Sequence, residues 1–204
     1  MTLVGFKRAT IGVFDETGKV VGKHVIEGKT NEGATTEAEI NGLAAEATKA
    51  YGSDVAYYVS QSGTGDVKVN LGILDLPAGV EDSILGLFVA TSGLSYFGEK
   101  TNAPYCNLLL ESTTLSGEPC GLGVLKGKFS KESIKVKSRE DGKDAPEAES
   151  LVFSAIESDA ENETKGNVVG KAPTKELLTK LSDLMFGSTP VSKSTEKNVA
   201  QTKG

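Results

Sequence analysis

The 204-residue chain lacks the residues from which most catalytic and metal sites are built. It has no Trp, a single His and only two Cys. Zinc sites with several His ligands or with four Cys ligands are therefore excluded. No apolar run approaches the ~18 residues of a membrane-spanning helix, so we expect no stable membrane association.

Recognisable catalytic or ligand-binding motifs are also missing. Residues 121–127 are glycine-rich but lack the spacing and the βαβ context of a nucleotide loop. His24 has no nucleophile motif beside it. The alternating acids of residues 157–163 lack the glycine and the later bidentate Glu of a calcium loop. We therefore expect no enzyme activity, no catalytic residue, no metal and no cofactor.

The composition is that of a folded chain of modest size. Hydrophobic residues make up 38% and charged residues 25%, and the 24 glycines follow no collagen period. We expect a single β domain over residues 1–187. Residues 188–204 contain few apolar side chains, and we expect them to form a flexible tail.

The two cysteines are predicted to be reduced. The first eight residues lack the pattern of a secretion signal, which predicts a cytoplasmic product. Cys106 and Cys120 fall at opposite ends of a predicted hairpin, too far apart for a disulfide bond.

Hydrophobic alternation predicts a strand-rich fold. A turn at residues 15–18 separates two opening strands, and residues 62–65 are predicted to join the strands 55–61 and 66–74 as a hairpin. Further strands are expected at 103–113, 121–130, 133–138 and 150–156.

Two helices interrupt this pattern. A short helix is expected at residues 80–86, and a longer one begins after the capping residue Thr174 and ends at Gly187. Several short strands separated by turns indicate a β-sandwich or β-barrel with one short flanking helix and a C-terminal helix.

The segment that follows the polar loop 27–35 has two interpretations. Helical spacing from Ile40 to Tyr51 favours a helix, whereas Asn41-Gly42 is a turn dipeptide. Residues 36–40 alternate in a way that favours a strand instead. Periodicity alone leaves both open.

Charge is unevenly distributed. Residues 126–139 carry six bases and one acid, and residues 140–163 carry nine acids and one base. The two stretches are either two solvated surfaces or complementary surfaces that meet between copies of the chain. The candidates for such contacts are Lys126, Lys128, Lys135, Lys137, Glu157, Asp159 and Glu161. The net charge of −6 disfavours tight nucleic-acid binding.

Several segments, in order, resemble one known family. They are residues 5–18, 36–43, 49–53, 108–112, 125–130 and 150–155. Together they are similar to the major tail proteins (tail tube proteins) of long non-contractile-tailed phages, or siphophages, of Gram-positive bacteria. The resemblance covers roughly residues 3–156, and its order and spacing carry more weight than any one segment.

The resemblance implies a structural virion protein. Such a protein has a sandwich- or barrel-like fold, self-assembles into hexameric rings and stacks them into a tube. The tube holds a tape-measure protein, is bounded by tail initiator and terminator proteins, and later passes DNA to the host. The resemblance also implies assembly in the host cytoplasm and favours a strand at residues 36–41.

Two sets of residues are expected to serve such a tube. The candidates for the lumen are Glu37, Glu39, Asp66 and Asn70, and those for an inter-ring loop are Lys29, Thr30, Asn31 and Glu32. Another virion module, such as a capsid decoration protein, is the alternative reading. A small-ligand-binding β-barrel or an unrecognised enzyme fits less well, because no polar residues converge on a pocket motif.

Overall fold

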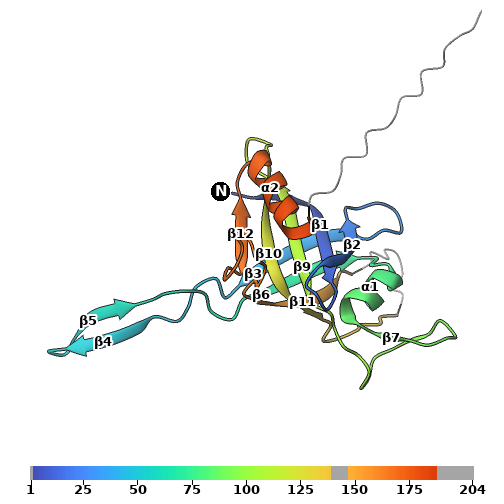
Figure 1. Cartoon of the computed structure of the whole chain (residues 1–204), viewed down its shortest axis with the longest axis horizontal. Helices are drawn as coiled ribbons and strands as arrows, with labels where there is room; N and C mark the ends of the chain where they lie inside the picture. The colour runs from blue at the N-terminus through green and yellow to red at the C-terminus, as the bar shows by residue number, and fades with distance from the viewer. Residues whose placement is uncertain (1, 139–146, 188–204) are drawn as a thin grey trace, which may run out of the picture.

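A computed structural model describes residues 2–138 and 147–187 (Figure 1). The chain opens with a hairpin of β1 (Val4–Phe14) and β2 (Val20–Ile26), which pair antiparallel. The Asp15 carboxylate closes the turn by accepting hydrogen bonds from the backbone N–H groups of Thr17 (2.8 Å) and Lys19 (3.0 Å). The predicted opening hairpin is confirmed.

One antiparallel sheet forms the body of the molecule. Its strands follow the order β2-β1-β9-β10-β11-β6-β3, and β12 pairs with the first half of β10. The bounds are β3 (Ala34–Asn41), β6 (Lys68–Leu74), β9 (Cys106–Thr113), β10 (Pro119–Ser130), β11 (Glu149–Ile156) and β12 (Val169–Ala172).

The sheet curves strongly. Its far ends approach each other closely enough for the Thr35 hydroxyl to donate to the carbonyl of Phe6 at 3.3 Å. The sheet does not close into a barrel within the described residues, because β2 and β3 remain its ends. The mainly β, sandwich-like fold expected from the sequence is confirmed.

The main core lies on the inner side of this curved sheet. Val67, Val69 and Leu71 alternate with exposed neighbours, as predicted, and are buried. The rings of Phe129 and Phe153 pack 4.7 Å apart between β10 and β11. The helix α1 (Ala78–Leu85) adds Ile84 and Leu85 to the same core.

The second helix covers the opposite side of the sheet. α2 (Lys175–Phe186) begins at Thr174, whose hydroxyl accepts a hydrogen bond from the N–H of Leu177. It packs on Leu109 and Leu125, which point away from the main core. Both predicted helices are confirmed.

Two local expectations require correction, one open alternative is decided, and some short strands, β12 among them, were not expected. Residues 34–41 form the strand β3, so the helix reading is wrong and the strand implied by the resemblance is confirmed. β5 (Val55–Ser60) pairs with β4 (Thr48–Gly52) and not with β6, so the hairpin at 62–65 is wrong. Residues 133–138 form no strand, and β12 was not expected.

Candidate assembly surfaces

The pair β4–β5 forms an arm that projects from the sheet body (Figure 1). At its base the N–H of Gly65 donates to the carbonyl of Gly42 at 2.9 Å, which brings the two chains of the arm together. Every residue of β4 and β5 is exposed. The arm's exposed large side chains are Tyr51, Val55, Tyr57, Tyr58 and Val59, and that of Tyr57 is 85% exposed.

A second, shorter arm follows α1. β7 (Phe88–Val89) pairs with β8 (Ser95–Tyr96), and the rings of Phe88 and Tyr96 lie 6.4 Å apart. Leu94 and Phe97 on the same arm are also exposed. Exposed apolar groups gathered on projecting segments are typical of protein interaction sites, because water solvates them poorly.

The two end strands of the sheet offer further contacts. β2 and β3 each have a neighbour on one side within the described part of the chain. Val21 and Val25 on β2 are exposed. A strand with an unpaired edge can extend its ladder onto a strand of another chain.

The residues predicted to face a lumen lie on one solvent-exposed face of the β3–β6 pair. Glu39 lies opposite Asn70 in the register, and Glu37 lies opposite Gly72. Asp66 precedes β6 and forms an ion pair with Lys68 at 3.1 Å. The structure therefore brings the predicted acidic residues together.

The sign of the charge on this face changes across the sheet. Lys68 lies opposite Ser154 on β11, which in turn lies opposite Lys128 on β10. The face thus runs from carboxylates on the edge strand β3 to lysines on the central strand β10.

The predicted inter-ring loop is compact. Lys29 forms ion pairs with Glu27 at 2.5 Å and with Glu32 at 3.8 Å. The Glu27 carboxylate raises the pKa of Lys29, and Lys29 lowers that of Glu27. The N–H of Gly28 donates to the carbonyl of Gly33 and closes the loop. Thr30 and Asn31 are exposed at its tip, and Asn31 has a φ of 62°.

The predicted complementary contacts include pairs that form inside one chain. Lys126 binds Asp159 at 2.5 Å, and this hydrogen bond lowers the pKa of Asp159. Lys137 binds Glu147, and Glu161 binds Lys165 at 2.6 Å. Within the described residues Lys128, Lys135 and Glu157 form no ion pair. Arg139 and residues 140–146 lie outside those residues.

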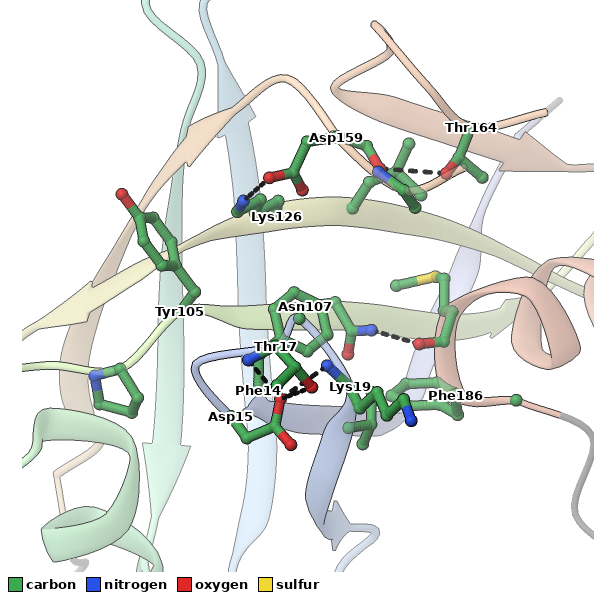
Figure 2. A pocket seen from close by; sticks show the side chains of 18 of the residues that line it. Phe14, Asp15, Thr17, Lys19, Tyr105, Asn107, Lys126, Asp159, Thr164 and Phe186 are labelled. Carbon is green, nitrogen blue, oxygen red and sulfur yellow. Dashed lines mark hydrogen bonds and ion pairs between the residues drawn. The ribbon is translucent and has the colours of Figure 1, made fainter. Parts of the chain in front are cut away.

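A groove of about 1070 Å³ lies beside the C-terminal end of α2 (Figure 2). Its walls are the β1–β2 turn, residues 102–107, the middle of β10, residues 158–164 and residues 184–187. We call it the β1–α2 groove. Five separate segments build it, so no local sequence pattern could have predicted it.

Charged and aromatic groups line the β1–α2 groove. The ammonium groups of Lys126 and Lys128 each lie 4.7 Å from the centre of the Tyr105 ring. Lys126 is held by Asp159, whereas Lys128 is half-buried without a carboxylate partner in the described part of the chain. Phe14 and Phe186 provide apolar walls (Figure 2).

Other candidate sites from the sequence have structural roles or no partners. A Cβ atom on Gly123 would collide with Met185, so the glycine-rich stretch of β10 allows α2 to pack closely. His24 is half-buried on β2 with its Nε2 unpaired, and burial lowers its pKa. Among the described residues no cluster of His, Cys, Asp and Glu is suited to a metal ion.

The cysteines are free, as predicted, and both are buried. Cys106 begins β9, and Cys120 lies opposite Ser112 near the other end of that strand. None of the helices in the described ranges is long and apolar enough to cross a membrane.

Comparison with known proteins decides the family. The sequence model for the phage tail tube protein matches residues 1–168. The chain belongs to the phage tail tube protein family. It is therefore a structural component of a bacteriophage tail. A comparison with individually curated proteins gives no match.

The family match ends before the C-terminal elements of this tail tube protein. The matched region ends at Val168, just before β12. β12 and α2 nonetheless pack on the same sheet, through Gly123 and Leu181. The C-terminal elements are thus integrated with the tail tube fold of this chain.

Proposed function

We propose that this tail tube protein self-assembles into hexameric rings that stack into the tube of a siphophage tail. The tube holds a tape-measure protein, ends at initiator and terminator proteins, is assembled in the host cytoplasm and later passes DNA. The observation that carries the proposal is the β4–β5 arm, whose apolar side chains have no cover in a single subunit.

The length of the arm supports contacts between rings. Its tip at Ser53 lies eleven positions along the chain from its base at Gly42, which corresponds to about 35 Å of extended chain. Such an arm reaches well beyond its own sheet to another subunit. Burial of its tyrosines would supply the apolar area that a stable interface needs.

The edges of the sheet support closure of a ring. Contact between β2 of one copy and β3 of the next is heterologous, and repetition of a heterologous contact generates rings or filaments. In this arrangement the carboxylates of Glu37 and Glu39 would line a bore that repels DNA. The loop containing Lys29 and Glu32 would make a smaller inter-ring contact.

The proposal is tested by removal of the arm. Residues 43–64 are replaced by a two-glycine turn, because Gly42 and Gly65 already lie within hydrogen-bonding distance. We expect a folded subunit, with unchanged circular dichroism, that forms no tubes in negative-stain micrographs. A second variant, in which residues 29–32 are replaced by glycines, tests the smaller contact and is expected to shorten tubes only moderately.

Two results would contradict the proposal. One is the formation of tubes of normal length without the arm. The other is a wild-type subunit that stays monomeric even at millimolar concentration and with preformed tail tips as seeds.

A further inference from the structure

The β1–α2 groove has a lysine at its aromatic wall that forms no ion pair with any described residue. Lys128 is half-buried, and its ammonium group lies 4.7 Å from the centre of the Tyr105 ring, which leaves it able to bind a carboxylate as well. Four carboxylates also line the groove. Asp159 is already bound to Lys126, and Glu161 to Lys165. Asp15 accepts hydrogen bonds from the backbone of its own turn, and Glu16 is exposed in that turn. The groove therefore fits a ligand that brings a carboxylate together with apolar or aromatic surface.

The tip of the β4–β5 arm has this chemistry. Asp54 is exposed in the turn between the strands, with a φ of 61°, and is the only carboxylate from residue 47 to residue 65. Exposed tyrosines flank it at positions 51, 57 and 58. The arm points away from its own body in Figure 1, so a groove that receives it belongs to another copy.

The shorter arm fits the groove less well. Its tip at residues 91–93 is uncharged, and its carboxylate, Glu99, lies beyond the end of β8, next to Lys100. Its lysine, Lys100, lies over its own Phe88 ring at 4.4 Å. Charge complementarity thus selects the β4–β5 arm.

We propose that the arm tip of a second copy docks in the β1–α2 groove, where Lys128 binds Asp54 and Tyr105 contacts the tyrosines of the arm. This inference rests on the proposed function and names the receptor for its arm. The contact is heterologous, since each copy offers one arm and one groove, and it therefore propagates from subunit to subunit.

A charge swap tests the pairing. Asp54→Lys and Lys128→Asp are each expected to raise the protein concentration required for tube formation at least about tenfold, because a charge-assisted hydrogen bond is lost and like charges meet. The double variant Asp54→Lys/Lys128→Asp is expected to restore most of the loss. Glu118→Lys, in another exposed hairpin turn, and Lys171→Asp, on β12, are the matched controls and should behave as wild type.

Asp54→Asn separates charge from backbone conformation. Asn tolerates the positive φ of this position as Asp does, so a loss of assembly in this variant reports the carboxylate alone. Circular dichroism and size-exclusion chromatography of each subunit confirm that the body remains folded.

A cross-link locates the contact independently of its strength. In Asp54→Cys/Lys128→Cys, mild oxidation of assembled material is expected to give a ladder of disulfide-linked oligomers. The native cysteines are buried and do not compete. The variant Glu118→Cys/Lys128→Cys should give no ladder.

The outcomes separate the two proposals. If wild-type protein forms no tubes, the proposed function fails and the docking inference fails with it. If wild-type tubes form but the single charge variants assemble normally, or the swap restores nothing and the cysteines do not cross-link, only the docking inference is overturned.

Discussion

At the scale of single residues, Asn107 connects the two layers of this tail tube protein. Its side-chain oxygen accepts a hydrogen bond from the N–H of Gly12 at 3.0 Å, and its side-chain nitrogen donates to the carbonyl of Met185 at 2.6 Å. The residue is 1% exposed. A strand of the main sheet and the last turn of α2 are therefore fixed to each other by one amide.

Replacement of this amide should be costly. In Asn107→Leu the N–H of Gly12 and the carbonyl of Met185 lose their buried partner, so we expect a loss of about 2–4 kcal/mol in the free energy of unfolding. Urea denaturation measures this loss. Asn70→Leu, at an exposed position of β6, is the control and should change stability by less than about 0.5 kcal/mol.

The buried thiol of Cys106 should make the stability of the native state depend on pH. Burial raises the pKa of its thiol from 9.0 to about 12. At a pH between these two pKa values, the Cys106 thiol therefore keeps its proton in the native state and loses it in the unfolded state. The stabilisation of the native state by its buried, protonated thiol is complete below about pH 9 and is lost as the pH rises toward 12.

Thiol labelling at pH 8 checks the prediction for Cys106. We expect no reaction with a maleimide or an aromatic disulfide reagent in native protein, and reaction of both cysteines in urea. Rapid labelling of Cys106 in the folded subunit would contradict the buried environment described above.

At the scale of elements, α2 gains its stability from contact with glycines. Leu181 of α2 packs where Gly123 and Gly170 leave room. A Cβ atom on Gly170 would collide with Leu181, and one on Gly123 would crowd Leu181 and collide with Met185. Five apolar residues recur at helical spacing in α2, namely Leu177, Leu178, Leu181, Leu184 and Met185, yet Leu177 is 45% exposed. Helical period alone predicts the apolar side of a helix but not how wide its contact is.

Truncation of Leu181 should therefore cost much more than truncation of Leu177. We expect Leu181→Ala to lower the free energy of unfolding by about 2–4 kcal/mol, because a cavity forms against β10 and β12. Leu177→Ala on the same helix should cost less than about 1 kcal/mol. Thermal denaturation of both variants gives the comparison, and equal losses would contradict this packing.

Strand pairing was the hardest feature to predict from the sequence. Residues 62–65 look like a hairpin turn, but they form one side of the base of the arm, next to Gly42. Local turn chemistry identifies where a chain bends and not which strands then pair. Residues 133–138 alternate like a strand, yet no strand accepts them, and Val136 is 91% exposed. β12 is not predicted from the sequence because it is short and contains Gly170.

At the scale of the whole molecule, the sequence predicts the buried residues of a subunit better than the surfaces that could contact other subunits. The alternation in β6 identified its buried face directly, because a period of two is a local property. The β1–α2 groove and the arm's isolation depend on the packing of distant segments. No local sequence pattern marks Tyr105 as part of the groove or Asp54 as the tip of an arm.

The charge of the bore is the property of the assembled tube that the β3–β6 face should control. Glu37 and Glu39 are exposed side by side on β3 and lie away from the core, so their replacement by Lys should leave folding intact. If this face lines the bore as proposed, Glu37→Lys/Glu39→Lys tubes should retain more short DNA than wild-type tubes, because repulsion of the phosphates becomes attraction. Co-sedimentation of labelled DNA with tubes at low salt measures the difference, which should disappear at high salt. Glu118→Lys/Glu132→Lys, with the same change in net charge at two exposed positions away from β3 and β6, is the control. Equal DNA retention by the two double variants would show that overall charge, and not the β3–β6 face, governs passage through the tube.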